Sequence, residues 1–302
     1  MTILRIETVT YGIDDMPACI AFMEDWGLEK LESGAAGAGF RTRENQHLLL
    51  RRSDDPGLPA TEEDGPTVRE IIWGVDSPEG LLAVAAELSR DRDIREDDGG
   101  TLHTRDDNGF AIGFAIADIA PADPPEVALN FHEDIRRINA DNWPAERAAP
   151  LRIGHAVYSI RREGNRKAAQ FYMERLKFRL TDRSEDGGTF LRCEGSNFHH
   201  TLFLFHRQGT RNYFNHLAFE MPSFDEIMTG GSHMKKSGAV SVSGPGRHSL
   251  GSNWFWYFKN PCGGNIEYFA DMDRMNDDWE PRYWEQSPPY ARWMLGEDVL
   301  TG

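Results

Sequence analysis

Two histidines and one glutamate are the residues of this sequence with the clearest chemical potential. His155 occurs in GHAVYSI and His216 in NHLAFEM, two segments typical of the opening strands of related units. Either histidine by itself would more often be a satisfied core residue, but equivalent strands of related units lie near each other. Glu267 lies in the apolar stretch NIEYF, where a buried carboxylate is costly unless a positive charge meets it. Two imidazoles and one carboxylate on one face of an ion form a non-heme Fe(II) arrangement, so we predict a metal site.

Most of the ten histidines show no such pattern. Four of them lie in polar segments and are expected to be solvated: His47, His103, His132 and His233. His206 ends a strand beside Arg207 and is predicted to lie at the surface. His199 and His200 occur together in FHHTLFLF. Because side chains alternate along a strand, we expect one of this pair to face away from any site that the other faces.

Four segments of the chain share one order of predicted elements. Each begins with a strand, continues into an amphipathic helix and closes with about three strands. The opening strands are ILRIETVTYGI, TVREIIWGV, LRIGHAVYSI and YFNHLAFEM. A βαβββ unit repeated four times predicts an α+β fold with two units in each of two domains. We place these domains at residues 1–120 and 151–272, joined by a Pro- and Asp-rich linker at 121–150 and followed by a tail at 273–302.

Composition narrows the class of protein. The 302 residues have a formal net charge of −16, with 39% hydrophobic and 27% charged residues, as globular proteins have. This charge argues against nucleic acid or an anionic membrane as a partner. The three cysteines are far apart and form no C-x-x-C pair, which excludes a cysteine zinc site and fits a reducing compartment. The sequence shows no signal peptide and no apolar run of about 18 residues, so we expect a cytoplasmic protein.

The C-terminal half resembles the type I extradiol ring-cleavage dioxygenases of the vicinal oxygen chelate superfamily. The resemblance runs from about Leu151 to Asp271 and rests on GHAVY, FHHTLFLF, NHLAFE and GRHSLGSNWFWYFKNPCGGNIEY. It implies that the four units form two vicinal-oxygen-chelate domains. It also implies that His155, His216 and Glu267 bind Fe(II), with Mn(II) as an alternative that the same ligands accept. The N-terminal units lack these histidines, as they do in the family, which implies a structural role for them.

The resemblance further implies how the reactants would meet. A catechol would chelate the metal through both oxygens, dioxygen would bind beside it, and one ring bond beside the diol would be cleaved. His200 falls on the position that faces the dioxygen site, where it would assist proton transfer. His248 and Tyr257 fall on positions around the substrate. Tyr257 would donate a hydrogen bond to a reacting oxygen, and His248 would contact a substrate oxygen or help orient Tyr257. We also expect a homo-oligomer.

The substituents of the catechol are less well defined by the sequence. Val157 is apolar where some members of the family have a hydrogen-bonding residue, and Phe255 shares a strand face with Tyr257, so both would line the pocket. Arg247 and Arg292 are the candidate partners of a substrate carboxylate. The segment DDWEPRYWEQSPPYARWM would cover the mouth of the site as a lid. These features suit an alkyl-, aryl- or fused-ring catechol and leave a carboxylated one open.

Two other functions stay open at this point. A metal-dependent isomerase or lyase could use the same scaffold, although the set of His200, His248 and Tyr257 speaks against it. A small-molecule-binding protein on this fold would need no metal ligands. The fold cannot choose among these functions, because one fold hosts many unrelated activities.

Overall fold

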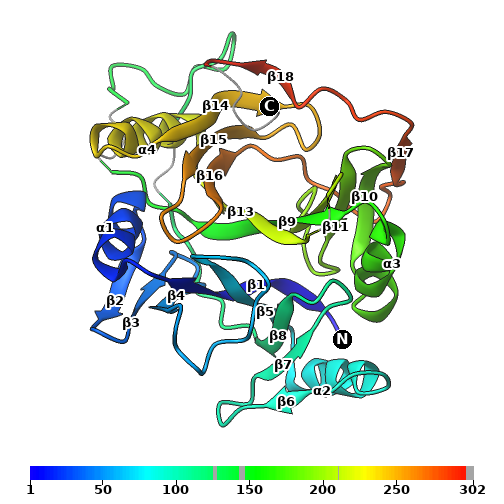
Figure 1. Ribbon diagram of the computed structural model, residues 1–302. Helices are drawn as coiled ribbons and strands as arrows, with labels where there is room; N and C mark the ends of the chain where they lie inside the picture. The colour runs from blue at the N-terminus through cyan, green and yellow to red at the C-terminus, as the bar shows by residue number, and fades with distance from the viewer. Residues whose placement is uncertain (125–127, 143–146, 210, 297–302) are drawn as a thin grey trace.

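Two β-sheets, each built from two βαβββ units, make up the computed structural model (Figure 1). The structure describes residues 1–124, 128–142, 147–209 and 211–296. The predicted α+β fold with four βαβββ units is therefore confirmed. Parts of the predicted linker (125–127 and 143–146) and the end of the predicted tail (297–302) lie outside the described residues, and the predicted domain boundaries remain a proposal. No helix in the described ranges is both long enough and apolar enough to cross a membrane.

The N-terminal sheet contains the first two units. Unit one consists of β1 (Ile3–Ile13), α1 (Met16–Trp26), β2 (Glu29–Ser33), β3 (Gly37–Arg41) and β4 (His47–Arg52). Unit two consists of β5 (Thr67–Val75), α2 (Pro78–Leu88), β6 (Arg95–Glu96), β7 (Leu102–Arg105) and β8 (Ala111–Ile116).

The C-terminal sheet contains the other two units and the tail. Unit three consists of β9 (Arg152–Arg161), α3 (Asn165–Gln170) with a π-helical continuation (Phe171–Arg175), β10 (Arg179–Ser184), β11 (Gly188–Arg192) and β12 (Leu202–Arg207). Unit four consists of β13 (Tyr213–Glu220), α4 (Phe224–Lys236), β14 (Ser241–His248), β15 (Trp254–Lys259) and β16 (Asn265–Ala270). The tail adds β17 (Arg282–Trp284) and β18 (Ala291–Met294).

The same pairing pattern organises both sheets. The opening strands of the two units pair antiparallel at the centre, β1 with β5 and β9 with β13. The last strand of each unit then pairs in parallel on the outside, so β12 lies beside β9 and β16 beside β13. The tail strands extend both edges, because β17 pairs with β10 and β18 with β14. The C-terminal sheet therefore runs β17-β10-β11-β12-β9-β13-β16-β15-β14-β18 and curls round in Figure 1.

Short polar residues fix where three of the helices begin. The side chains of Asp15, Ser77 and Ser223 accept hydrogen bonds from the backbone N–H three residues later, at 3.0, 3.1 and 3.3 Å. These bonds satisfy N–H groups that have no partner inside the helix. In Figure 1, α3 and α4 lie outside the curled C-terminal sheet.

The two sheets pack into one continuous apolar core. Trp26 at the end of α1 stacks on Tyr268 of β16 with ring centroids 3.5 Å apart, and the Tyr268 hydroxyl donates to the Trp26 carbonyl at 2.6 Å. Strand side chains alternate between faces, so Tyr268 packs against the N-terminal half while its neighbour Glu267 points to the opposite face. The N-terminal half thus supports the strand on which Glu267 lies.

A buried acid joins the two halves at a second point. Asp106, in the turn after β7, is 5% exposed and accepts a hydrogen bond from the Tyr172 hydroxyl at 2.8 Å. Its other oxygen accepts from the backbone N–H groups of Asn108 and Phe110, each at 2.9 Å. Burial raises the pKa of Asp106 to about 6, although these hydrogen bonds act to lower it.

We predict that Asp106→Asn stabilises the protein at neutral pH relative to the wild type. Between pH 3.8, the ordinary pKa, and about 6, folded Asp106 keeps a proton that the unfolded chain has lost. The stabilisation that Asp106 gives the wild type is therefore fully present below pH 3.8 and is lost as the pH rises through about 6. Asparagine cannot ionise. The free energy of unfolding of the variant should therefore rise relative to that of the wild type by up to about 3 kcal/mol between pH 4 and pH 7. Urea unfolding at both pH values measures this difference.

The exposed Asp98 provides the control for this substitution. Asp98→Asn removes the same formal charge from the same half of the protein and should follow the wild-type profile. Parallel stability profiles for wild type and Asp106→Asn would contradict a raised pKa at Asp106.

Candidate active site

Strand register brings His155, His216 and Glu267 to one face of the C-terminal sheet. In the β9–β13 pair His155 lies opposite Ala218, and in the β13–β16 pair Ala218 lies opposite Glu267. His216 comes two residues before Ala218 on β13 and so points to the same face. The small Ala218 side chain leaves space between the two larger ones on its flanks. We call His155, His216 and Glu267 the ligand cluster.

The ligand cluster has the geometry of a metal site. Glu267 Oε2 lies 3.1 Å from His155 Nε2 and 3.3 Å from His216 Nε2. One ligand atom from each residue lies within 4.8 Å of the other two, and all three residues are buried. The other oxygen, Oε1, accepts a hydrogen bond from Asn253 Nδ2 at 3.3 Å. Oε2 is therefore the oxygen that faces both imidazoles.

The protonation states of the cluster suit a cation. Burial would raise the pKa of Glu267, but His155, His216 and His248 together lower it well below the ordinary value. Burial lowers the pKa of His216 despite the nearby carboxylate. A neutral His216 donates from Nδ1 to Asn215 Oδ1 at 2.8 Å, which leaves a lone pair on Nε2. That Nε2 is buried without a hydrogen-bond partner in the described structure, so these residues fit a divalent metal.

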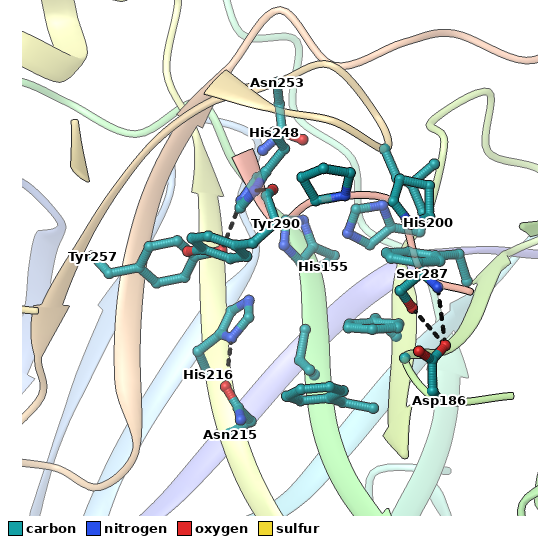
Figure 2. Close-up of a pocket in the computed structure, with 18 of the residues that line it drawn as sticks. His155, Asp186, His200, Asn215, His216, His248, Asn253, Tyr257, Ser287 and Tyr290 are labelled. Carbon is teal, nitrogen blue, oxygen red and sulfur yellow. Dashed lines mark hydrogen bonds between the residues drawn. The ribbon is translucent and has the colours of Figure 1, made fainter. Parts of the chain in front are cut away.

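A cavity of about 380 Å³ opens above the ligand cluster (Figure 2). Its polar lining includes three of the predicted site residues beside the ligands: His200, His248 and Tyr257. Its apolar lining comes from three phenylalanines, Val157, Leu250 and the residues Pro288, Pro289 and Tyr290. A cavity that is mostly apolar and holds a few converging polar groups is the usual form of a small-molecule site.

Tyr257 and His248 form one side of this cavity. The His248 Nδ1–H donates to the Tyr290 carbonyl at 3.0 Å, so His248 Nε2 accepts from the Tyr257 hydroxyl at 3.1 Å. Burial, followed by the charge of Glu267, raises the pKa of Tyr257 well above its ordinary value. Tyr257 therefore stays protonated and acts as a hydrogen-bond donor.

Comparison with known proteins relates one segment of the chain to a family. Residues 152–268 match the model of the Glyoxalase/Bleomycin resistance protein/Dioxygenase superfamily. The matched segment, called the superfamily domain below, includes the whole ligand cluster, together with His200, His248 and Tyr257.

Three similar proteins extend the comparison. Metapyrocatechase 2 of Cupriavidus necator is 35% identical over 128 residues, which are 42% of this chain and only 39% of that relative. The manganese-dependent 2,3-dihydroxybiphenyl 1,2-dioxygenase of Geobacillus genomosp. 3 is 20% identical over 262 residues, 81% of each chain. The Mn(II)-bound glyoxalase from Novosphingobium aromaticivorans has a TM-score of 0.77 at 23% identity, over 99% of this chain and 93% of that one. This last likeness shows the fold.

A buried polar chain lies behind His200 in the superfamily domain. His200 Nδ1 is 3.0 Å from His199 Nδ1, and His199 Nε2 is 2.7 Å from Asp182 Oδ2. Because a carboxylate only accepts, His199 donates from Nε2 and must accept at Nδ1 from His200. His200 then carries its proton on Nδ1 and presents the lone pair of Nε2. Burial, followed by repulsion from His155 and His199, lowers the pKa of His200 well below its usual value.

The C-terminal tail reaches both sides of the superfamily domain's cavity. We call residues 282–294 the strap, because they run from β17 at one sheet edge to β18 at the other. At the first edge Arg282 donates two hydrogen bonds to Asp182, at 2.9 and 2.7 Å, and Trp284 Nε1 donates a third at 2.7 Å. Between the edges, Ser287 to Tyr290 line the cavity. The predicted lid thus corresponds to a segment that lies over the cavity.

The structure does not bring every predicted substrate residue into the cavity. Val157 lines it, but Phe255 is fully buried behind His248, with ring centroids 3.9 Å apart. Arg292 is exposed on β18 and is not among the lining residues. Arg247 is paired with Asp271 at 2.8 Å and is also absent from the lining. Strand alternation placed Phe255 on the face of Tyr257 correctly, but His248 lies between Phe255 and the cavity.

Proposed function

We propose that the protein cleaves the ring of a substituted catechol with dioxygen at a mononuclear Fe(II) centre, giving a ring-opened, semialdehyde-type product. The supporting observation is that groups able to move protons surround the ligand cluster. His200 lies on one side of the cavity, and Tyr257 with His248 lies on the other (Figure 2). The 35% identity to a metapyrocatechase over 128 residues adds support.

The protein's own residues would orient the catechol and hold its protons. A bound divalent metal would supply Lewis acidity, which lowers the pKa of a coordinated hydroxyl group. His200 would accept a proton at Nε2, the nitrogen left free by the His199 contact, and return it later. Tyr257 has one hydroxyl hydrogen, so on substrate binding it would turn from His248 Nε2 to donate to a substrate oxygen, and the freed Nε2 would accept from a substrate hydroxyl group. The apolar lining would exclude water from the ring.

The charges of the site suit an anionic catechol. Glu267 is an anion because its pKa lies well below the ordinary value, and burial keeps His216 neutral. A divalent cation with one carboxylate ligand keeps one positive charge, which a catechol that has lost one proton balances. We include Mn(II) as an alternative ion, since the same nitrogen and oxygen donors accept both metals. We also propose that the protein is cytoplasmic and forms a homo-oligomer.

Aerobic turnover of a panel of substituted catechols by Fe(II)-loaded protein tests this function. We expect coloured products whose masses equal substrate plus both atoms of dioxygen. Metal analysis of the purified protein, followed by reloading with Fe(II) or Mn(II), identifies the active ion. Iron-loaded protein that leaves every catechol intact would contradict the proposal. Turnover without dioxygen would instead favour an isomerase or lyase. A glyoxalase shares this fold, so the experiment includes this alternative.

A further inference from the structure

The far end of the cavity carries a cationic side chain with no carboxylate partner. Arg207, the last residue of β12, lines the cavity. No carboxylate oxygen of a described residue lies within 4.0 Å of its guanidinium, which lies over the Phe205 ring at 4.6 Å from the centroid. The other charged lining residue, Asp186, already accepts from the backbone N–H and hydroxyl of Ser287, at 3.0 and 3.1 Å. Arg207 is therefore available to an anion that enters the cavity.

An aromatic shelf connects His200 to this guanidinium. The ring of Phe190 lies 5.1 Å from His200 and stacks on Phe203 at 3.9 Å. Phe203 in turn stacks on Phe205 at 5.6 Å. Phe203, Phe205 and Arg207 alternate along β12 and so point to one face of the strand. A flat or extended apolar group can lie along this shelf with one end near the ligand cluster.

The length of the shelf sets the kind of ligand. Strand β12 runs beside β9 in parallel register, with Phe203 opposite Val157 and Arg207 opposite Arg161. Four residues of strand, from Phe203 to Arg207, cover about 13 Å. Although the guanidinium lies back over Phe205, we infer that it meets the far end of a substituent rather than a group attached directly to the catechol ring. The strap adds apolar lining to the cavity through Pro288, Pro289 and Tyr290.

We propose that Arg207 is an anion subsite that selects catechols whose long aryl or alkyl substituent ends in a carboxylate. The substituent would lie on Phe190, Phe203 and Phe205, and its carboxylate would accept hydrogen bonds from the guanidinium. This inference rests on the proposed catechol-cleaving function. It assigns the carboxylate to Arg207, whereas the sequence pointed to Arg247 and Arg292, which lie outside the cavity.

The test compares three 3-arylcatechols that differ only at the far end of the aryl ring: hydrogen, carboxylate or aminomethyl. The wild type should favour the carboxylate over the neutral compound by about tenfold or more in kcat/KM, the effect of one charge-assisted hydrogen bond. Arg207→Gln should remove this preference, mainly through KM. Calorimetric binding of the same compounds to Mn(II)-loaded protein without dioxygen should show the same order, independently of turnover.

Arg161→Gln is the matched control. Arg161 is the cross-strand neighbour of Arg207, is exposed and does not line the cavity. This variant should keep the preference for the carboxylate. An equal loss in both variants would mean a general charge effect and would overturn the subsite, as would a preference for the aminomethyl compound. If the wild type cleaves the neutral and the carboxylated compound equally well, the subsite fails while the function stands. If it cleaves neither, the function fails and the binding comparison still tests Arg207.

Discussion

Glu267→Gln should abolish metal binding and lower catechol turnover by more than about 100-fold. Glu267 supplies the negative charge of the ligand cluster, and its carboxylate lies within 3.3 Å of both ligand imidazoles. A neutral amide cannot balance a divalent cation in a buried site. Even partners that only orient a metal ligand typically cost 10- to 100-fold when removed, so a ligand should cost more. Metal content after dialysis and the rise in melting temperature on adding Mn(II) measure binding directly.

Glu220→Gln is the control for this loss. Glu220 is also a buried acid on β13, but it pairs with Arg152 and Arg274 and lies outside the cavity lining. Its variant should lose stability and still bind one metal ion per chain. A Glu267→Gln protein that kept its metal would show that the ligand cluster is not the metal site. The same measurement on the His155→Ala protein, which lacks one ligand imidazole, should also show loss of metal.

The repeats and the ligand cluster could be predicted because both depend on local pattern and symmetry. Strand and helix periods define each βαβββ unit, and the opening strands of paired units lie side by side in the structure. His155 and His216 occur on such strands, so their proximity follows from the repeat. Glu267 was detectable because a carboxylate on an apolar strand needs a partner. None of these inferences required knowledge of a loop.

The supporting residues could not be predicted, because loops and the tail decide their contacts. His199 was expected to face away from the site, and it is not among the cavity-lining residues. Nothing in the sequence indicated that it is fully buried between His200 and Asp182. His206 was expected at the surface but is 1% exposed, and it contacts Asn165 and Thr189 at 3.3 and 3.2 Å. A polar residue at the end of a predicted strand gives no sign of such burial.

Asp182→Asn should lower kcat on the order of 100-fold while metal content and KM change little. The carboxylate accepts from His199 Nε2 and, through both oxygens, from Arg282 and Trp284. Burial would raise the pKa of Asp182, but these donors lower it, so the group is an anion that only accepts. Asparagine would place an NH₂ group towards His199 and reverse its tautomer. His200 would then carry its proton on Nε2, where it cannot accept one from the substrate. Orienting partners of metal-site histidines have effects of this size.

Trp284→Phe separates this orienting role from a structural one. It removes one hydrogen bond to Asp182 and leaves the His199 contact, so kcat should fall far less than in Asp182→Asn even where the melting temperatures fall equally. The protonated nitrogen of His200, read from ¹⁵N chemical shifts of the histidine rings, should change from Nδ1 to Nε2 only in Asp182→Asn. Loss of metal, or equal loss of kcat in both variants, would mean that Asp182 only holds the strap. Because Arg282 and Trp284 belong to the strap, the same comparison shows how a segment some 80 residues beyond His200 in the sequence controls its proton.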